Sequence, residues 1–200
     1  MARIDYYFST VSPYTYLAGT RMEEVAARHG ATIAYKPVDL TGALFARTGG
    51  VPVKERHPAR LDYRLQELRR QSARHGLPLD LDPPYRAVNP APSSYAFIAA
   101  AKAGGGDLGA LVHALTGAVW RDNRDIAEDA VIADCLEATG FDRGLAGMGM
   151  LAGAEDYVRN TEEAVNAGVF GAPFYIVDGS EKFWGQDRIE DLDMFLSGKL

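Results

Sequence analysis

The chain has 200 residues, of which 47% are hydrophobic, and a formal net charge of −6 at pH 7. This length and composition are enough for a substantial core in one domain, or in one domain that carries a large insertion. The acidic balance, with no basic cluster interleaved with aromatic residues, argues against a nucleic-acid partner.

Cysteine and histidine usage narrows the class of protein further. Cys135 is the only cysteine, so no internal disulfide is possible and a reducing, cytoplasmic location is expected. The four histidines are scattered without metal-ligand spacing, and no metal site is expected. No segment has the length of a membrane span, and the N-terminal residues lack the pattern of a secretory signal, so neither feature is expected.

The N-terminal part of the chain predicts a β-α-β unit. Residues 3–9 predict a buried strand, residues 13–29 a helix and residues 32–35 a second strand. Two strands joined in this way form a parallel pair with a right-handed crossover. The glycines and prolines of residues 41–56 predict a loop near the carboxyl end of the second strand, the edge where open α/β sheets bind ligands.

The middle of the chain is predicted to be helical. Short loops between the helices are typical of a bundle, and the predicted helices cover residues 58–74, 93–103, 107–120, 126–139, 142–150 and 153–167. Strands return at residues 174–177 and 181–184 around an Asp-Gly turn, and a helix over residues 187–196 ends the chain. The pattern predicts an α/β fold with an inserted helical domain.

The segment between the first strand and the first helix carries the first candidate functional residue. Ser12 followed by Pro13 predicts an N-cap with proline at the first helical position. Free N–H groups and the helix dipole place about half a positive charge at such a point, which lowers the pKa of a thiol bound there. The Ser12 hydroxyl could donate a hydrogen bond to such a thiolate, or it could only cap the helix.

Motifs at both ends of the chain indicate a family. A Gly-x-Pro at residues 171–173 precedes a strand, Trp184-Gly185-Gln186-Asp187-Arg188 precedes the last helix, and Ser-Pro-Tyr-Thr-Tyr-Leu occupies residues 12–17. With residues 35–40 and 62–63, these motifs resemble the glutathione-dependent 2-hydroxychromene-2-carboxylate isomerases. That family is grouped with the kappa-class glutathione transferases in the DsbA-like branch of the thioredoxin superfamily. The resemblance implies a thioredoxin-like domain of residues 1–45 and 166–200, with an inserted all-helical domain of residues 46–165.

The same resemblance implies a glutathione site with Ser12 as its catalytic residue. Pro173 is expected to be a cis-proline opposite the first helix. The backbone N–H and C=O of Ala172 would then pair with the cysteinyl unit of glutathione, as a short strand would. The other possibility is an ordinary proline ahead of a strand.

The segment before the last helix is implied to hold the γ-glutamyl end of glutathione. Asp187 is expected to accept bonds from its ammonium group, and Trp184, Gly185 and Gln186 are expected neighbours. Gln186 stands where the family usually has asparagine or serine. The spacing of Asp187 and Glu190 also predicts a capping box at the start of the last helix.

The substrate residues depart from the family pattern. Leu44 stands where a lysine that could hold a carboxylate is usual, so Lys54 or Arg47 is expected to supply that charge, although both could be solvated surface residues. Tyr85 matches a family tyrosine. Tyr14 could stack on an aromatic substrate or belong to the core.

The resemblance implies an isomerase that acts with glutathione as cofactor in aromatic catabolism. It would interconvert 2-hydroxychromene-2-carboxylate and trans-o-hydroxybenzylidenepyruvate, an aromatic oxo-acid, by reversible thiolate addition, and the family habit suggests a homodimer. The alternatives are a kappa-like glutathione transferase, an isomerase of another unsaturated acid, or a non-catalytic protein that binds thiol peptides. Disulfide exchange through a dithiol of its own is excluded by the single cysteine.

Overall fold

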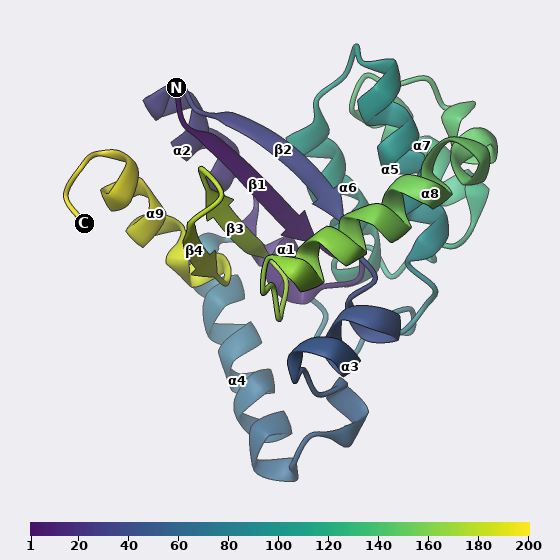
Figure 1. The fold of residues 1–200 in the computed structure, drawn as a ribbon. Coiled ribbons are helices and arrows are strands. Elements are labelled where there is room, and N and C mark those ends of the chain that lie inside the picture. Colours follow the sequence, from purple (N-terminus) through teal and green to yellow (C-terminus); the bar gives the residue numbers. More distant parts are fainter.

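A mixed four-stranded sheet forms the centre of the molecule (Figure 1). The computed structural model describes residues 1–200. The strands, in the order β2-β1-β3-β4, are β1 (Arg3–Phe8), β2 (Thr32–Pro37), β3 (Phe174–Val177) and β4 (Glu181–Trp184). β1 and β2 are parallel, whereas β3 runs antiparallel to both β1 and β4. All four predicted strands are confirmed, and the thioredoxin-like class is confirmed with them.

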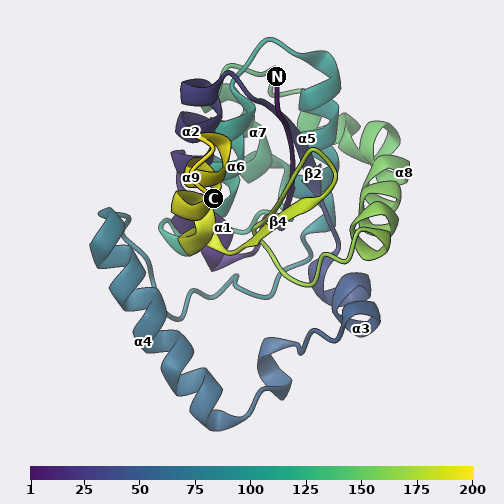
Figure 2. The ribbon, with the colours of Figure 1, turned by 60° about the vertical axis from the view of Figure 1, so that its left-hand side comes forward.

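The two faces of the sheet bury alternate side chains of β1, as the twofold period of a strand requires. Tyr6 and Phe8 lie in the larger core with α1 (Pro13–Ala18), α2 (Arg21–His29) and α9 (Ile189–Leu196). Tyr7 lies in a smaller core on the other face, beneath the end of α8 (Leu145–Asn166). Figure 2 shows the helices on either side of the sheet.

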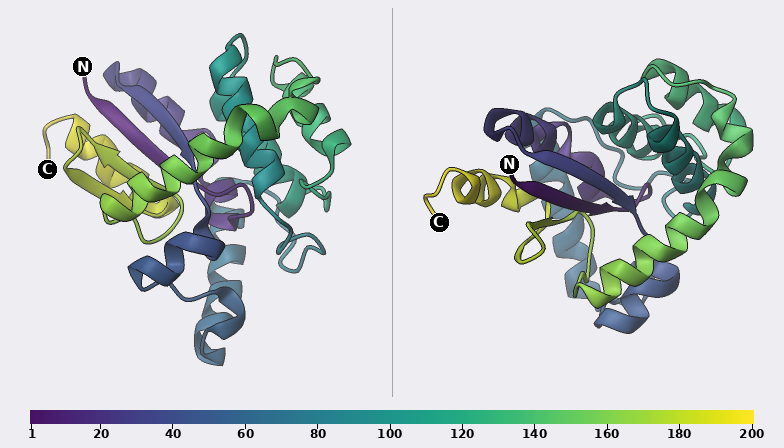
Figure 3. Two further views of the ribbon diagram at one scale, coloured as in Figure 1. Left: turned by 45° about the vertical axis from the view of Figure 1, so that its right-hand side comes forward. Right: turned by 45° about the horizontal axis from the view of Figure 1, so that its top comes forward.

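The middle of the chain supplies the remaining helices, which Figure 3 shows from two further sides. They are α3 (Phe45–Thr48), α4 (Pro58–His75), α5 (Ala91–Ala103), α6 (Leu108–Trp120) and α7 (Asp129–Ala138), with single turns η1 (Leu40–Leu44), η2 (Val53–Glu55) and η3 (Gln186–Arg188). The expected loop over residues 41–56 is therefore largely a series of short helical turns. α4 extends away from the sheet, with its N-terminal end farthest out (Figures 1 and 2).

Three predicted helices differ from the structure. The helix expected over residues 13–29 is interrupted at Gly19, whose φ of +60° ends α1 before α2 begins at Arg21. The two helices expected over residues 142–150 and 153–167 are one continuous helix, α8. Its glycines do not end it, because Gly149 and Gly153 face the backbone of α5 in close contact.

One core joins the sheet to the helical part. Twenty-nine buried residues form a single cluster that includes side chains of β1, α1, α5, α6 and α7. Phe8 of β1 meets Phe97 of α5 edge to face, with ring centroids 5.0 Å apart. The division into residues 1–45 with 166–200 and residues 46–165 stays a prediction, but the two parts are packed as one body. None of the helices combines the length and hydropathy that crossing a bilayer requires.

Candidate functional site

Ser12 occupies the N-cap of α1 and also contacts the loop before β3. Its Oγ accepts a hydrogen bond from the backbone N–H of Thr15 at 3.2 Å, so the predicted cap is confirmed. The same hydroxyl donates to the carbonyl of Ala172 at 3.2 Å. Two segments 160 residues apart thus meet at one buried hydroxyl, whose single proton is directed at a neutral carbonyl oxygen.

The Ala172–Pro173 peptide bond is cis, as expected. The carbonyl of Pro173 accepts from the N–H of Gly185, which ends the ladder between β3 and β4. The N–H of Ala172 makes no hydrogen bond within the chain. A free N–H beside a strand end is the donor that an added peptide strand would use.

The first turn of α1 leaves a second free backbone donor. Pro13 has no N–H, and the N–H groups of Thr15 and Tyr16 bond to Ser12. Only the Tyr14 N–H stays without a partner in this turn. Because α1 has six residues, its dipole is smaller than that of the 17-residue helix predicted over residues 13–29. The local donors therefore matter more than the helix dipole.

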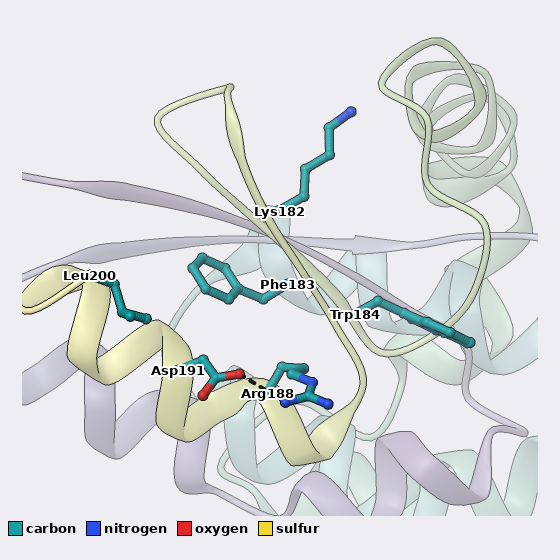
Figure 4. A pocket seen from close by; sticks show the side chains of 6 residues that line it. All are labelled: Lys182, Phe183, Trp184, Arg188, Asp191 and Leu200. Carbon is teal, nitrogen blue, oxygen red and sulfur yellow. Dashed lines mark hydrogen bonds and ion pairs between the residues drawn. The ribbon is translucent and has the colours of Figure 1, made fainter.

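Trp184 ends β4 as a half-exposed aromatic side chain beside the loop that carries Pro173. Its ring lies edge to face with Phe170, at a centroid distance of 4.8 Å, and its indole lies over Gly171. An open hollow of about 500 Å³ lies between β4 and α9, and Trp184 is the one predicted site residue in its lining (Figure 4). The charged pair in it, Arg188 and Asp191, is mutually satisfied at 3.0 Å.

Gln186 lies inside the fold rather than at its surface. The side chain is 2% exposed, and its Oε1 accepts from Nη2 of Arg21 at 2.5 Å. The same guanidinium also donates to the carbonyl oxygens of Gln186 and Leu17. Gln186 therefore ties η3 to the end of α1, and a contact of its side chain with glutathione stays a prediction.

The capping box predicted at Asp187 is wrong. α9 begins at Ile189, and no side chain caps its first turn. The Asp187 carboxylate instead folds back over Gly185, where a Cβ would collide with Oδ1 and where φ is +109°. Its side chain is 55% exposed, and its nearest cation is Arg188 at 3.8 Å. The carboxylate is thus free to accept hydrogen bonds from a ligand.

The structure separates the two cations expected to hold the substrate. Arg47 is bonded through both terminal nitrogens to Glu162 of α8, which raises the Arg47 pKa. Lys54 lies in η2 with its side chain exposed and without an ion pair or hydrogen bond. Leu44 is fully buried in the smaller core, so the lysine that it replaces would not fit that environment.

Of the two predicted tyrosines, Tyr14 lies beside a cation that sequence reasoning missed. Tyr85 is half-buried in the turn before α5. The ring of Tyr14 is also half-buried, which raises its pKa, and the guanidinium carbon of Arg64 lies 6.0 Å from its centroid. Arg64 is one of several arginines along α4, and nothing in their spacing distinguishes it from those that face solvent.

The single cysteine belongs to the core rather than to the site. Cys135 lies on α7 with 6% of its surface exposed, and burial raises the pKa of its thiol to about 11. Such a thiol is almost entirely protonated at neutral pH. The structure also contains no group of three or more histidine, cysteine or carboxylate side chains placed to hold a metal.

Comparisons with known proteins show the family and the fold of the chain. The model of the DsbA-like thioredoxin domain matches residues 3–197. The 2-hydroxychromene-2-carboxylate isomerase of Sphingobium xenophagum is 30% identical over 96% of this chain and 97% of its own. The isomerase of the same name from Pseudomonas putida is 30% identical over 93% of this chain and 90% of its own. A solved 2-hydroxychromene-2-carboxylate isomerase, 27% identical, superposes with a TM-score of 0.78 over 98% of this chain and 95% of its own.

The fold and the cis-proline define a thioredoxin-like protein whose candidate site has Ser12 at the start of α1 and no cysteine. The chain belongs to the DsbA-like family, within the group of 2-hydroxychromene-2-carboxylate isomerases. The relatives are isomerases, which supports an enzyme of that class.

Proposed function

We propose that the protein is a glutathione-dependent isomerase that interconverts 2-hydroxychromene-2-carboxylate and trans-o-hydroxybenzylidenepyruvate. The names of the relatives support the reaction. The observation that carries the role of glutathione is the Ser12 hydroxyl, held between the start of α1 and the Ala172 carbonyl in a chain without a thiol at that place.

The residues of the site fit a thiol peptide. The free N–H of Ala172 would bond its backbone as a strand edge does, and the exposed carboxylate of Asp187 would accept from its ammonium group. Glutathione, when bound, would supply a thiolate that adds reversibly to the conjugated alkene, so that rotation becomes possible before the thiolate leaves.

Ser12 would stabilise that thiolate by turning its proton. The hydroxyl has one proton, which points to the neutral carbonyl of Ala172. A hydrogen bond to a charged acceptor is stronger than one to a neutral carbonyl, so the proton would turn toward a thiolate when one is bound. The Ser12 oxygen would still accept from Thr15, and α1 would keep its cap during the change.

An absorbance assay of the isomerisation tests this function. The expected result is turnover with glutathione, none without it, and none with S-methylglutathione, which has the same peptide but no ionisable thiol. Free thiol measured after many turnovers should equal the amount added, because the cofactor is regenerated.

The alternatives give other results in this assay. Loss of thiol in step with loss of substrate would identify a transferase. Calorimetric binding of glutathione without turnover would indicate an isomerase of another unsaturated acid or a thiol-peptide binding protein, and turnover of other unsaturated acids would separate these two. Equal rates with and without glutathione would contradict the proposed function.

A further inference from the structure

Arg64 is a half-buried cation without a charged partner. It lies on α4, and no carboxylate lies within 4 Å of its guanidinium and no hydrogen bond satisfies its N–H groups. Most arginines in the chain are otherwise engaged, for example Arg21 with Gln186 and Arg47 with Glu162. Burying a charge without a partner costs free energy, so the arrangement favours an anion that the chain does not supply.

Two aromatic rings hold this guanidinium. Its central carbon lies 6.0 Å from the ring centroid of Tyr14 and 5.9 Å from that of Trp120. Cation–π contacts of this kind attract the cation to the ring face. No hydrogen bond within the chain uses the N–H donors of Arg64, so they are available to a ligand, and arginine presents those donors as a fork that matches a carboxylate.

The position of Arg64 connects it to the thiol site. Tyr14 follows Ser12 by two residues on α1. Trp120 donates its indole N–H to the carbonyl of Val11 at 3.1 Å, one residue before Ser12. Both rings that hold Arg64 are therefore anchored to the segment of residues 11–14.

Further positive charge surrounds the same point. Burial lowers the pKa of Arg64, and the neighbouring Arg56 and Arg86 lower it further. Arg86 has a carboxylate partner in Asp82 at 2.9 Å, whereas Arg56 donates only to a backbone carbonyl. Glu67, which lies near Tyr14, is directed to Arg70 at 3.7 Å. Asp187 also acts on Tyr14, but its nearest cation is Arg188, so Arg64 has no anionic partner within the chain.

We propose that Arg64, whose guanidinium lies against the rings of Tyr14 and Trp120, is the carboxylate-binding residue of the site next to Ser12. The proposal rests on the function proposed above, whose substrate and cofactor both carry carboxylates. It places the main cation on α4, in contrast to Lys54 and Arg47, which are respectively exposed and paired with Glu162.

Calorimetry with three probes tests the proposal. The probes are 2-hydroxycinnamate, its neutral amide, and glutathione, measured on the wild type, Arg64→Gln and the control Arg69→Gln, an exposed arginine on α4 without an ion pair. Loss of a charge-assisted bond of this kind weakens binding roughly tenfold to a hundredfold. We expect that rise in the Kd of 2-hydroxycinnamate for Arg64→Gln, no change for the amide, and no change in Arg69→Gln.

The two carboxylate probes distinguish whether Arg64 binds the carboxylate of the substrate or that of glutathione. A rise in the glutathione Kd with 2-hydroxycinnamate unaffected would support the subsite with the carboxylate of the cofactor as its ligand. Unchanged affinities in Arg64→Gln, or a wild type that binds neither carboxylate, would overturn the proposal. If Arg64→Gln does not fold, Arg64→Lys keeps the charge but loses the fork, and a Kd raised severalfold is expected.

The isomerisation assay separates this proposal from the proposed function. If the wild type is inactive but binds 2-hydroxycinnamate through Arg64, the proposed isomerase function is wrong and the carboxylate subsite is supported. If the wild type is active but its carboxylate affinities do not depend on Arg64, the isomerase function is supported and the subsite is wrong.

Discussion

The hydroxyl of Ser12 is shared between structure and chemistry. It accepts from Thr15 to cap α1, and its proton goes to Ala172. The oxygen of the hydroxyl thus accepts a hydrogen bond that the helix needs. Its proton points to the loop before β3, where a thiol peptide would bind. A substitution here should affect stability and catalysis by separable amounts.

Replacement of Ser12 by alanine tests that separation. Loss of the cap should cost about 1 kcal/mol of unfolding free energy. Loss of a charge-assisted hydrogen bond should lower kcat at saturating glutathione by about tenfold to a hundredfold. Denaturant melts and steady-state kinetics measure the two effects.

Ser9→Ala is the matched control for that variant. Ser9 is buried in the same segment, and its hydroxyl has no hydrogen-bond partner. Its removal should change neither kcat nor stability by much. An unchanged kcat in Ser12→Ala would leave Ser12 as a helix cap only.

Asp187 is expected to act on binding rather than on chemistry. Its carboxylate is exposed and does not cap α9, so Asp187→Asn should leave stability unchanged. Loss of an ammonium contact remote from the sulfur should raise the KM for glutathione with little change in kcat. Asp191→Asn, which removes the partner of Arg188 nearby, is the control. Equal calorimetric affinities of Asp187→Asn and wild type would contradict the assignment.

Lys54 should contribute less to substrate binding than a buried cation would. Its side chain is exposed, and an exposed ion pair is worth at most about 1 kcal/mol. Lys54→Met should therefore raise the substrate KM no more than severalfold, leave glutathione affinity alone, and be mimicked in part by added salt. Arg47→Met should have no such effect, because Glu162 already holds that side chain. The opposite pattern in these two variants would show that Arg47, and not Lys54, contributes to binding of the substrate carboxylate.

At the scale of residues, sequence reasoning found the groups whose role is local. Ser12 before a proline and the Gly-x-Pro motif are signals within a few positions, and the cap and the cis bond are both confirmed. Arg64 and the partner of Gln186 depend on contacts between distant segments. Arg64 contacts Trp120 on another helix, and Gln186 contacts Arg21, which is 165 positions away, so no local sequence pattern predicts these contacts.

At the scale of elements, glycine was the ambiguous signal. Gly19 has a positive φ and ends α1, whereas Gly153 continues α8. Gly19 stands inside a predicted helix and Gly153 at the start of one, and a single glycine at such positions allows a helix either to end or to continue. The packing of α8 on α5 explains the glycine at position 153, because a Cβ there would lie 2.6 Å from the carbonyl oxygen of Tyr95 on α5. Gly153 is thus required by helix packing rather than by helix ending.

Alanine substitutions within α8 test this packing. Gly153→Ala should destabilise by about 1–3 kcal/mol, because the backbone of α5 has to move to admit the methyl group. Gly147→Ala has open space around it and should be neutral or stabilising by up to about 1 kcal/mol, because alanine is the better helix former. Thermal melts of both variants measure the contrast. Stabilisation by Gly153→Ala would show that the two helices have room to spare.

At the scale of the whole molecule, the sheet and the helical part share one buried cluster. The sequence correctly predicts that helices are inserted between strands, but it does not indicate whether the insertion has its own core. Tyr6 and Phe8 of β1 lie in the same cluster as Trp120 of α6 and Leu136 of α7. Since neither part buries its apolar surface without the other, they should unfold together.

The two tryptophans make that cooperativity measurable. Trp120 lies in the helical part and Trp184 in the sheet. In Trp184→Phe the fluorescence reports the helical part, and in Trp120→Phe it reports the sheet. In each variant the fluorescence transition in denaturant should coincide with that variant's own circular dichroism transition, which corrects for any loss of stability from the substitution itself.

Alkylation of Cys135 gives a third, independent measure of the same event. Because burial raises its pKa to about 11 and closes access, the thiol should react at pH 8 only in molecules that have opened. The free energy of opening obtained from the alkylation rate should equal the free energy of unfolding obtained from the melts. A markedly smaller value, with the Trp184 signal still native, would show that the helical part opens alone and that residues 46–165 are a separate folding unit.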